Sequence, residues 1–321
     1  MEQTCIDNGK LKDFSIYSYD EKFVPDVNIV LNEHNHHYFY QQYNGYKIAY
    51  VVWESTKFDD NFFERMLYFD ELWVPSNWQK ECIIQQGYSK NKVKVITEGV
   101  DTQIFYPEKV DLLEDYKDNR FKFLLFGRWE YRKATKEIIE TFLKTFDKDE
   151  PVDLIVSVDN LYSIDGMNST EERLKHYGFE DDRIKIKSFV SREDYIKYMK
   201  TGHVFLSCSR GEGWNLPLIE AMSCGIPAIY SNWSGQLEFA KGFGHPVKVI
   251  GEKLANFSGV DIPGNYCEPD FNDLSKKIRS VYENYSIFIN KSLKESKIIR
   301  QNFNWKVAAE KAYKIINNIK I

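Results

Sequence analysis

The sequence predicts an α/β protein built on doubly wound parallel sheets, and three observations support this fold class. Apolar runs of strand length alternate with segments of helical length, and the connections between them are short. The runs are apolar enough for strands that are buried on both faces of a sheet. The 321 residues are 43% hydrophobic, which is enough for one large or two ordinary domains with cores of their own.

The first half of the chain contains one alternating unit. We expect strands at 27–31, 47–53, 71–74 and 92–96. Helices are expected at 61–69 and from Ser76, a good N-cap residue, to Gly87. A charged segment without glycine, 108–120, marks the clearest boundary in the chain. The predicted organisation is an N-terminal domain at 1–110, a linker at 111–120 and a C-terminal domain at 121–302.

The second half repeats the alternation. Strands are expected at 121–127, 152–158, 184–189, 203–207 and 226–231. Helices are expected up to about residue 146, at 169–177 and from Ser191. A further helix runs from Pro217, which suits its first position, to Gly225, which suits the position after its end. From Asp270 onward the chain is expected to be helical.

Composition excludes some classes of protein. The net charge of −5, with Lys and Arg spread evenly, argues against a nucleic-acid binder that relies on phosphate neutralisation. The start of the chain lacks the apolar core of a signal peptide, and no run approaches the length of a membrane span. The five cysteines lie far apart without a CxxC pair, which favours thiols and a cytoplasmic location: Cys5, Cys82, Cys208, Cys224 and Cys267.

Two acids stand out in the segment 203–238. Glu212 lies on a loop that follows a predicted strand, and Glu220 lies about one turn inside the helix that comes next. Open α/β sheets bind ligands at this edge, and the amides at the start of such a helix suit a phosphate. Carboxylates there would accept hydrogen bonds from the hydroxyls of a ribose and a sugar.

The spacing Glu212-x7-Glu220, within GEGWNLPLIEAMSCGIP, resembles the EX7E signature of retaining GT-B glycosyltransferases, the group 1 or family 4-like enzymes. The segment 71–107 is also similar to the end of that family's first domain, with Gly99-Val100-Asp101 and Phe105-x-Pro107. This resemblance implies two Rossmann-like doubly wound domains facing across a cleft. It also implies that a terminal helix, 303–321, crosses back onto the first domain.

The resemblance further implies a hexosyltransferase of glycan biosynthesis. Such an enzyme moves a hexose from a nucleoside-diphosphate sugar to a hydroxyl of a glycan, lipid or protein-linked acceptor, with retention of configuration. No cofactor and no metal are expected, because cations and amide dipoles can stabilise the leaving diphosphate and no Asp-x-Asp pair is placed to hold an ion. Peripheral membrane contact and a second glycosyltransferase module or subunit remain open as partners.

The family's site residues are carried over by position. Gly127, Arg128 and Lys133 would hold the donor's diphosphate, although Ala134 stands where the family usually has Gly. Arg132 could share the role of the lysine, and a solvated basic turn is the alternative. Glu212 would hold the transferred sugar and Glu220 the ribose. Backbone groups complete the expected donor site, at the base for Ser188 and Val190 and at the sugar or phosphate for Trp214, Asn215 and Leu216.

The N-terminal half departs from the family pattern, because it has no Gly-rich loop and looks shortened. Trp53-Glu54 ends a strand there, and Glu54 could orient the sugar or receive the acceptor's proton. The cluster His34, His36 and His37 is interpreted as a polar loop in which His36 is the catalytic candidate, rather than as a metal site.

Two other functions stay open at this point. A non-catalytic GT-B partner of an active transferase would explain the departures in the first domain, and a sugar-nucleotide epimerase would require more acids and histidines. Trp214 and Trp233 flank the expected donor pocket and could stack on a base or sugar. Trp73 and Trp78 are expected to pack in the core or between the domains.

Overall fold

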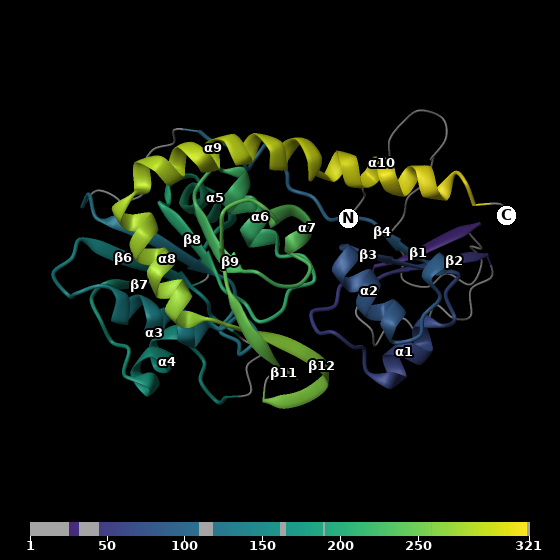
Figure 1. The fold of residues 1–321 in the computed structure, drawn as a ribbon, viewed down its shortest axis with the longest axis horizontal. Coiled ribbons are helices and arrows are strands. Elements are labelled where there is room, and N and C mark those ends of the chain that lie inside the picture. The colour runs from purple at the N-terminus through teal and green to yellow at the C-terminus, as the bar shows by residue number, and fades with distance from the viewer. Residues whose placement is uncertain are drawn as a thin grey trace.

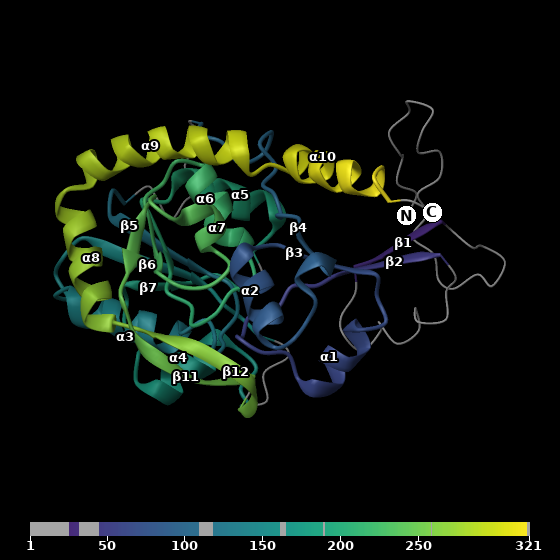
Figure 2. The same ribbon diagram turned by 45° about the vertical axis from the view of Figure 1, so that its right-hand side comes forward.

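The computed structural model describes residues 26–31, 45–108, 118–160, 165–188, 190–257 and 259–319. His34, His36, His37 and most of the expected linker lie outside these residues, so the predictions made for them are not tested. Figures 1 and 2 show two α/β units side by side, with the C-terminal helices running across the top of both.

Each unit is built on a parallel sheet, as the sequence predicted. Within the described residues the first sheet has the order β1-β2-β3-β4, with β1 (Val27–Val30), β2 (Tyr46–Tyr50), β3 (Glu71–Val74) and β4 (Val93–Val95). The second has the order β10-β9-β8-β5-β6-β7, with β5 (Phe121–Phe126), β6 (Val152–Ser157), β7 (Ile184–Ile186), β8 (Val204–Ser207), β9 (Ala228–Ser231) and β10 (His245–Val247).

The strand order of the second sheet is that of a Rossmann fold. The chain starts in the middle with β5, moves outward to β7, and then returns to β8 on the other side of β5. The order therefore reverses between β5 and β8, and the crevice beyond the carboxyl ends of these two strands is where such sheets bind ligands.

The expected helices are present, several of them with the predicted caps. They are α1 (Asp60–Met66), α2 (Asn77–Gln85), α3 (Thr135–Thr145), α4 (Thr170–Tyr177), α5 (Arg192–Thr201), α6 (Leu216–Ser223), α8 (Phe271–Glu283), α9 (Tyr285–Asn302) and α10 (Trp305–Ile316). Ser76 and Ser191 each accept a hydrogen bond from an amide in the first turn of α2 and α5. Pro217 is the second residue of α6, because Asn215 is the N-cap and Leu216 begins the helix.

The alternation of side chains along β5 places one core cluster on each face of the second sheet. Phe123 and Leu125 face the cluster that α3 and α8 complete, whereas Leu124 and Phe126 face the one that α5 and α6 complete. Helices thus cover both faces of the sheet, which explains why its strands read as continuous apolar runs.

The C-terminal helices join the two units. The chain passes from α9 to α10 beside the first unit, where the Val100 amide donates to the Phe303 carbonyl at 2.9 Å. Ile315 and Ile316 of α10 then pack on a small cluster that contains Ile48 and Trp73 of the first sheet. The expected return of the terminal helix is therefore confirmed, and Figure 1 shows α10 lying over this sheet.

A β-hairpin that we did not predict contacts the first unit. Its strands, β11 (Val249–Phe257) and β12 (Val260–Pro269), follow β10 and pair antiparallel. The pairing register shifts between Leu254 and Ala255, and the backbone opposite this shift reaches the first unit. There the Asn265 amide donates to Thr56 Oγ1 at 2.8 Å, and Ser55 Oγ donates to the Pro263 carbonyl at 2.9 Å.

Two other predictions needed correction or extension. The helix expected to reach Phe69 ends at Met66. The strands expected to reach Trp53 and Phe189 end at Tyr50 and Ile186, so the local patterns overestimated the lengths of these elements. A short helix, α7 (Leu237–Ala240), lies between β9 and β10.

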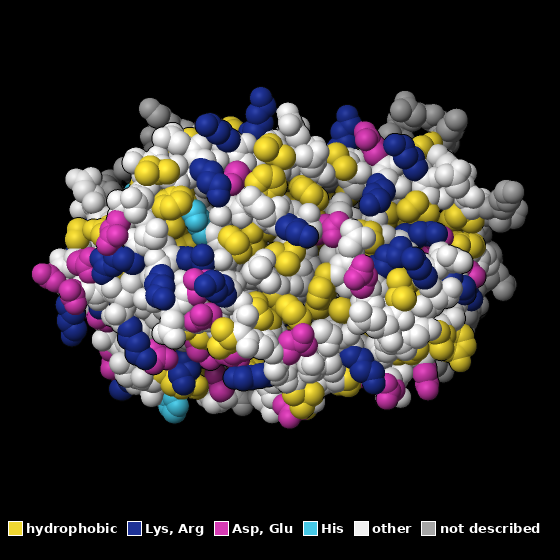
Figure 3. All heavy atoms as spheres, in the orientation of Figure 1, with side chains coloured by type: hydrophobic (Ala, Val, Ile, Leu, Met, Phe, Trp, Pro, Cys, Tyr) yellow, Lys and Arg dark blue, Asp and Glu magenta, His cyan; other side chains and the backbone are white. Residues whose placement is uncertain are grey.

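Over the described part of the chain, no helix is long and apolar enough to span a membrane. Charges of both signs are interspersed on the face shown in Figure 3.

Candidate functional site

The loop between β8 and α6 is held rigidly at the carboxyl edge of the second sheet. Asn215 adopts a left-handed conformation with φ 89°, and its side-chain oxygen accepts the Leu218 amide at 3.3 Å. The side-chain nitrogen of Asn215 donates to Ser207 Oγ at 2.9 Å and to Gln236 Oε1 at 2.8 Å. These bonds fix the loop that carries Glu212, and Asn215 acts there through its side chain.

Glu212 is the acid of an ion-pair network. Its side chain is buried, and its carboxylate lies 2.7 Å from Lys133 Nζ and 3.1 Å from an Arg132 nitrogen. Burial alone would raise the pKa of Glu212, but Lys133 and Arg132 outweigh this effect and lower it below its ordinary value. Glu212 is therefore ionised at neutral pH.

Arg132 connects Glu212 to the first unit. Its guanidinium donates to the Gly211 carbonyl at 2.9 Å and lies 3.2 Å from Glu130 and 3.7 Å from Glu54. Burial opposes the charge of Arg132, yet Glu54, Glu212 and Glu130 raise its pKa above the ordinary value. The sequence suggested Glu54 and Glu212 as separate candidates, and the structure brings both to one guanidinium.

Glu220 lies in a different environment, on α6, where its side chain faces α5. Its carboxylate accepts a hydrogen bond from the Tyr195 hydroxyl and lies 3.6 Å from an Arg192 nitrogen. Burial raises the pKa of Glu220, against the opposing effects of Tyr195 and Arg192. Sequence reasoning missed these two partners, although Arg192 and Tyr195 are three residues apart and therefore lie on one face of α5.

A cavity of about 420 Å³ is lined by both partners of Glu220, although Glu220 itself does not line it. It sits where β5 and β6 end and where α5 and α6 begin, and Tyr195 and Arg192 form part of its wall. The other lining residues are Phe126, Gly127, Ser157, Asp159, Val190 and Pro217. The candidates Gly127 and Val190 therefore line one cavity at the crevice that the strand order marks.

Other candidates lie elsewhere. Arg128 is 44% exposed and pairs with Glu130 at 2.9 Å instead of joining Glu212. Ser188 is exposed and does not line the cavity, and Leu216 is 39% exposed. The expected stacking role of the Trp214 side chain is wrong, because its indole is buried against Phe239 in the core, with 5.0 Å between the ring centroids.

Trp73 and Trp78 pack as expected, whereas Trp233, the other stacking candidate, packs against Trp78. Trp73 is buried in the first unit, and its indole nitrogen donates to Glu71 at 2.9 Å. Trp78 of α2 and Trp233 of the second unit meet edge to face, with 6.2 Å between their ring centroids. Trp233 therefore lies at the contact between the two units.

Ala134 occupies a position that favours glycine. It precedes α3 with φ 52° and ψ 31°, in the left-handed region, and is fully buried. The backbone at Ala134 therefore keeps the left-handed turn that a glycine would adopt without strain, although a methyl group is present. Within the described residues, no group of three His, Cys, Asp or Glu side chains could hold a metal ion.

The Rossmann-ordered sheet, the smaller parallel sheet beside it and the returning terminal helix define the GT-B fold. Solved structures share it. A crystal structure of Anabaena HepE in complex with UDP and glucose matches with a TM-score of 0.72 and 15% identity, over 92% of this chain and 78% of that one. The sucrose-phosphate synthase of Thermosynechococcus elongatus matches with a TM-score of 0.64 and 20% identity, over 87% and 69%.

Sequence comparison supports a particular family for the second unit. Residues 113–247 match the model of glycosyl transferases group 1. The UDP-Gal:alpha-D-GlcNAc-diphosphoundecaprenol alpha-1,3-galactosyltransferase of Escherichia coli is 32% identical over 174 residues, 50% of this chain and 42% of that protein. The phosphatidylinositol N-acetylglucosaminyltransferase gpi3 subunit of Schizosaccharomyces pombe is 20% identical over 77% of this chain and 48% of that protein. The chain thus spans less than half of these curated relatives.

Proposed function

We propose that this chain is a retaining glycosyltransferase that moves a hexose from a nucleoside-diphosphate sugar to an acceptor hydroxyl. One observation carries the proposal. A cavity of about 420 Å³ lies where α6 begins, and a buried network of acids and cations surrounds Glu212 in the loop before α6, at the carboxyl edge of a Rossmann-ordered sheet.

The cavity suits the nucleoside part of the donor. Glu220, held by Tyr195 and Arg192, would accept hydrogen bonds from the ribose hydroxyls, and the backbone near Val190 would contact the base. The diphosphate would lie across Gly127 toward the first amides of α6. Because HepE binds UDP and the Escherichia coli relative is named for UDP-Gal, we propose that the base is uracil.

The network suits the transferred sugar and the leaving group. Glu212 would accept hydrogen bonds from sugar hydroxyls, and Lys133, which pairs with Glu212 in this structure, would turn toward the diphosphate when the donor binds. The bond from the anomeric carbon to the β-phosphate oxygen breaks, and the bond to the acceptor oxygen forms on the same face, which retains the configuration. The acceptor's proton passes to the departing phosphate oxygen. In this proposal Lys133 and amide dipoles stabilise the leaving charge without a metal.

A ligand-dependent melting experiment tests the donor site. UDP, GDP, ADP, CMP and their sugar conjugates are each added to the protein, since a ligand that binds only the folded state raises Tm. We expect UDP compounds to raise Tm and Glu220→Ala to abolish the shift. Glu212→Ala should instead retain UDP binding and lower transfer at least a hundredfold, because it removes contacts to the reacting sugar.

Glu193→Ala is the matched control for Glu220→Ala. Glu193 lies on α5 beside Arg192, but its side chain is 79% exposed and pairs only with Lys197 among the described residues. It should leave the UDP shift unchanged. If neither Glu220→Ala nor Glu212→Ala has an effect, the proposed donor site is incorrect.

A non-catalytic partner is the second candidate, and one observation favours it. The first unit has only four strands within the described residues, and the Schizosaccharomyces pombe relative is named as a subunit. Release of UDP from UDP-sugar separates the two candidates. A transferase should hydrolyse the donor slowly without an acceptor, whereas a partner that keeps the fold alone should bind nothing or release no UDP. Metal independence and a cytoplasmic location stay predictions.

A further inference from the structure

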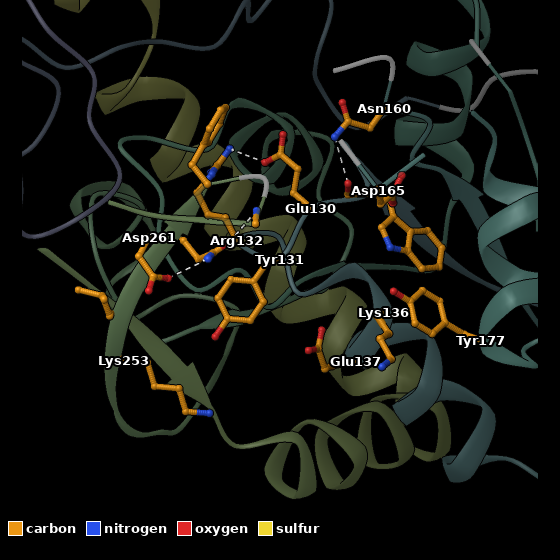
Figure 4. A pocket seen from close by; sticks show the side chains of 15 residues that line it. Glu130, Tyr131, Arg132, Lys136, Glu137, Asn160, Asp165, Tyr177, Lys253 and Asp261 are labelled. Atoms are coloured by element: carbon orange, nitrogen blue, oxygen red, sulfur yellow. Dashed lines mark hydrogen bonds and ion pairs between the residues drawn. The ribbon is translucent and has the colours of Figure 1, made fainter. Parts of the chain in front are cut away.

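A second cavity, of about 720 Å³, lies on the other side of the connection between β5 and α3. Figure 4 shows Tyr131 in the middle of its labelled side chains, with Lys253 and Asp261 of the hairpin on one side and Lys136 and Tyr177 on the other. The cavity is larger than the one proposed for the nucleoside and shares no lining residue with it.

The ring of Tyr131 is held in place and presents one face. Arg210 covers the other face, with its guanidinium carbon 4.1 Å from the ring centroid. Arg210 is itself buried and fixed by Glu137 at 2.9 Å and by Glu268 at 3.4 Å. Tyr131 nevertheless remains 40% exposed, so its free face is available to a ligand.

The hairpin supplies the opposite, apolar wall. Leu254 and Phe257 both line the cavity and are 54% and 52% exposed. The ring of Tyr177, by contrast, is already engaged, since it stacks on Trp129 at 6.0 Å between centroids and lies under Lys136 Nζ at 4.4 Å. The exposed faces of Tyr131, Leu254 and Phe257 are therefore the apolar surfaces that a ligand can cover.

The charged side chains that line the cavity are of both signs and are engaged within the protein, Lys136 by the ring of Tyr177 and Asp261 by the side chain of Asn256, so they do not favour a strongly charged ligand. Glu137 pairs with Arg210, Asp165 pairs with Arg173 at 3.0 Å, and Lys253 pairs with Glu268 at 2.9 Å. What remains is a set of oxygen and nitrogen atoms with further hydrogen-bonding capacity between two apolar rings. A saccharide matches this surface, because it has apolar C–H faces for rings and hydroxyls for carboxylates and amides.

The cavity also borders the reacting end of the proposed donor. Arg132 and Glu130 line it, and Arg132 contacts Glu212 at 3.1 Å. We propose that the cavity binds the non-reacting sugars of the acceptor, which is therefore an oligosaccharide or a glycoconjugate with more than one sugar. This inference rests on the proposed function, and it adds the substrate class and a binding site formed by the hairpin and the turn at Tyr131.

Binding of free glycans in the absence of donor tests this inference. The labelled full chain is applied to an array of neutral glycans from disaccharides upward, and the free glycan with the strongest signal is then titrated. We expect a subset of glycans to bind. Tyr131→Ala and Phe257→Ala should each weaken binding roughly tenfold, whereas Tyr131→Phe, which keeps the ring, should bind as the unchanged protein does.

Ile250→Ala is the matched control, because Ile250 is 69% exposed on the same hairpin but does not line the cavity. It should leave binding and donor hydrolysis unchanged, and Tm of every variant shows whether it folds. No glycan bound, binding retained in Tyr131→Ala and Phe257→Ala, or equal loss in Ile250→Ala would each overturn the inference. Donor hydrolysis without glycan binding would leave the proposed function standing and reject this site alone.

Discussion

Arg132 is the residue at which the charges of the candidate site meet. Three carboxylates surround its guanidinium, one from the first unit and two from the second. A planar group with five donors can serve several acceptors at once, which the ammonium of a lysine cannot do in the same geometry. The residue therefore holds Glu212 in an orientation that Lys133 alone would not define.

Ala134→Gly should behave unlike an ordinary alanine-to-glycine change. The left-handed conformation costs alanine about 1–2 kcal/mol, which roughly offsets the loss of a buried methyl group, about 0.8 kcal/mol, and the greater entropy of an unfolded glycine. We expect a change within about 1 kcal/mol in the free energy of unfolding. Ala221 is buried in the interior of α6, and Ala221→Gly should lower the free energy of unfolding by roughly 1 kcal/mol or more. Equal losses in urea melts would contradict this interpretation.

Glu98 should make stability depend on pH. Burial raises the pKa of Glu98 from 4.5 to about 7 in the folded chain. Between these values the folded state holds a proton that the unfolded state has lost, so the free energy of unfolding falls as pH rises from 4.5 to 7, by about 1.4 kcal/mol for each unit of pKa difference. Glu98→Gln should be more stable than the unchanged protein at pH 8 and similar at pH 4.5. If the free energies of unfolding of the two proteins change with pH in parallel, Glu98 is not the source of the pH dependence.

At the scale of elements, the central strand β5 contains a buried charged residue, Lys122. The side chain of Lys122 has 0% exposure, and its Nζ lies 2.7 Å from Asp153 Oδ2 on β6. Arg120 also pairs with Asp153, at 2.8 Å. The pairing of a buried cation and a buried acid on neighbouring strands adds a register-specific contact to the apolar packing of β5.

Lys122→Met should destabilise the protein by about 3 kcal/mol, because Asp153 is left buried with Arg120 as its remaining cation. Lys122→Met combined with Asp153→Leu should recover most of this loss, since neither fully buried charge remains and Arg120, which is 30% exposed, keeps its hydrogen bonds to the Glu150 and Val152 carbonyls. Chemical denaturation of the single and double variants forms a double-mutant cycle. Additive effects would show that the pair contributes no coupling energy.

At the scale of the whole molecule, the hairpin acts as a clasp between the units. Gly264 has φ 90°, and a Cβ atom there would overlap the Lys57 backbone nitrogen and approach Ser55 Oγ to 2.9 Å. The backbone of β12 can therefore approach the loop 53–57 closely only because this position has no side chain. The same loop carries Glu54, so the clasp also positions the acid that the first unit presents to Arg132.

Gly264→Ala should loosen the contact between the units. The added methyl group must displace the backbone of the first unit, and the positive φ adds strain on the order of 1 kcal/mol. We expect a larger radius of gyration in X-ray scattering and faster proteolysis at the loop 53–57. Gly251→Ala, on β11 with nothing within 4 Å of its Cβ position and no positive φ, is the control. Identical scattering of both variants would argue that the clasp is not needed for the arrangement.

The sequence by itself determined the order of most strands and helices, because local periodicity and caps are displayed directly by a single chain. The GT-B fold and the return of the terminal helix were implied by the family resemblance that the Glu212 and Glu220 spacing carries, and the structure confirms both. It also placed Glu212 and Glu220 on the correct loop and helix, where their side chains now have defined partners.

Only the tertiary structure decided which side chains meet. Lys133 and Glu212 are 79 residues apart, and Glu54 reaches Arg132 from another unit, so neither contact has a local signal. Trp214 faces the core because the turn at Asn215 orients the loop, which residue type alone cannot reveal. The contact of the hairpin with the first unit likewise depends on the close approach of the backbone at Gly264. Packing between residues far apart in the sequence determines these contacts, whereas the secondary structure of the elements that carry them is determined by local propensity.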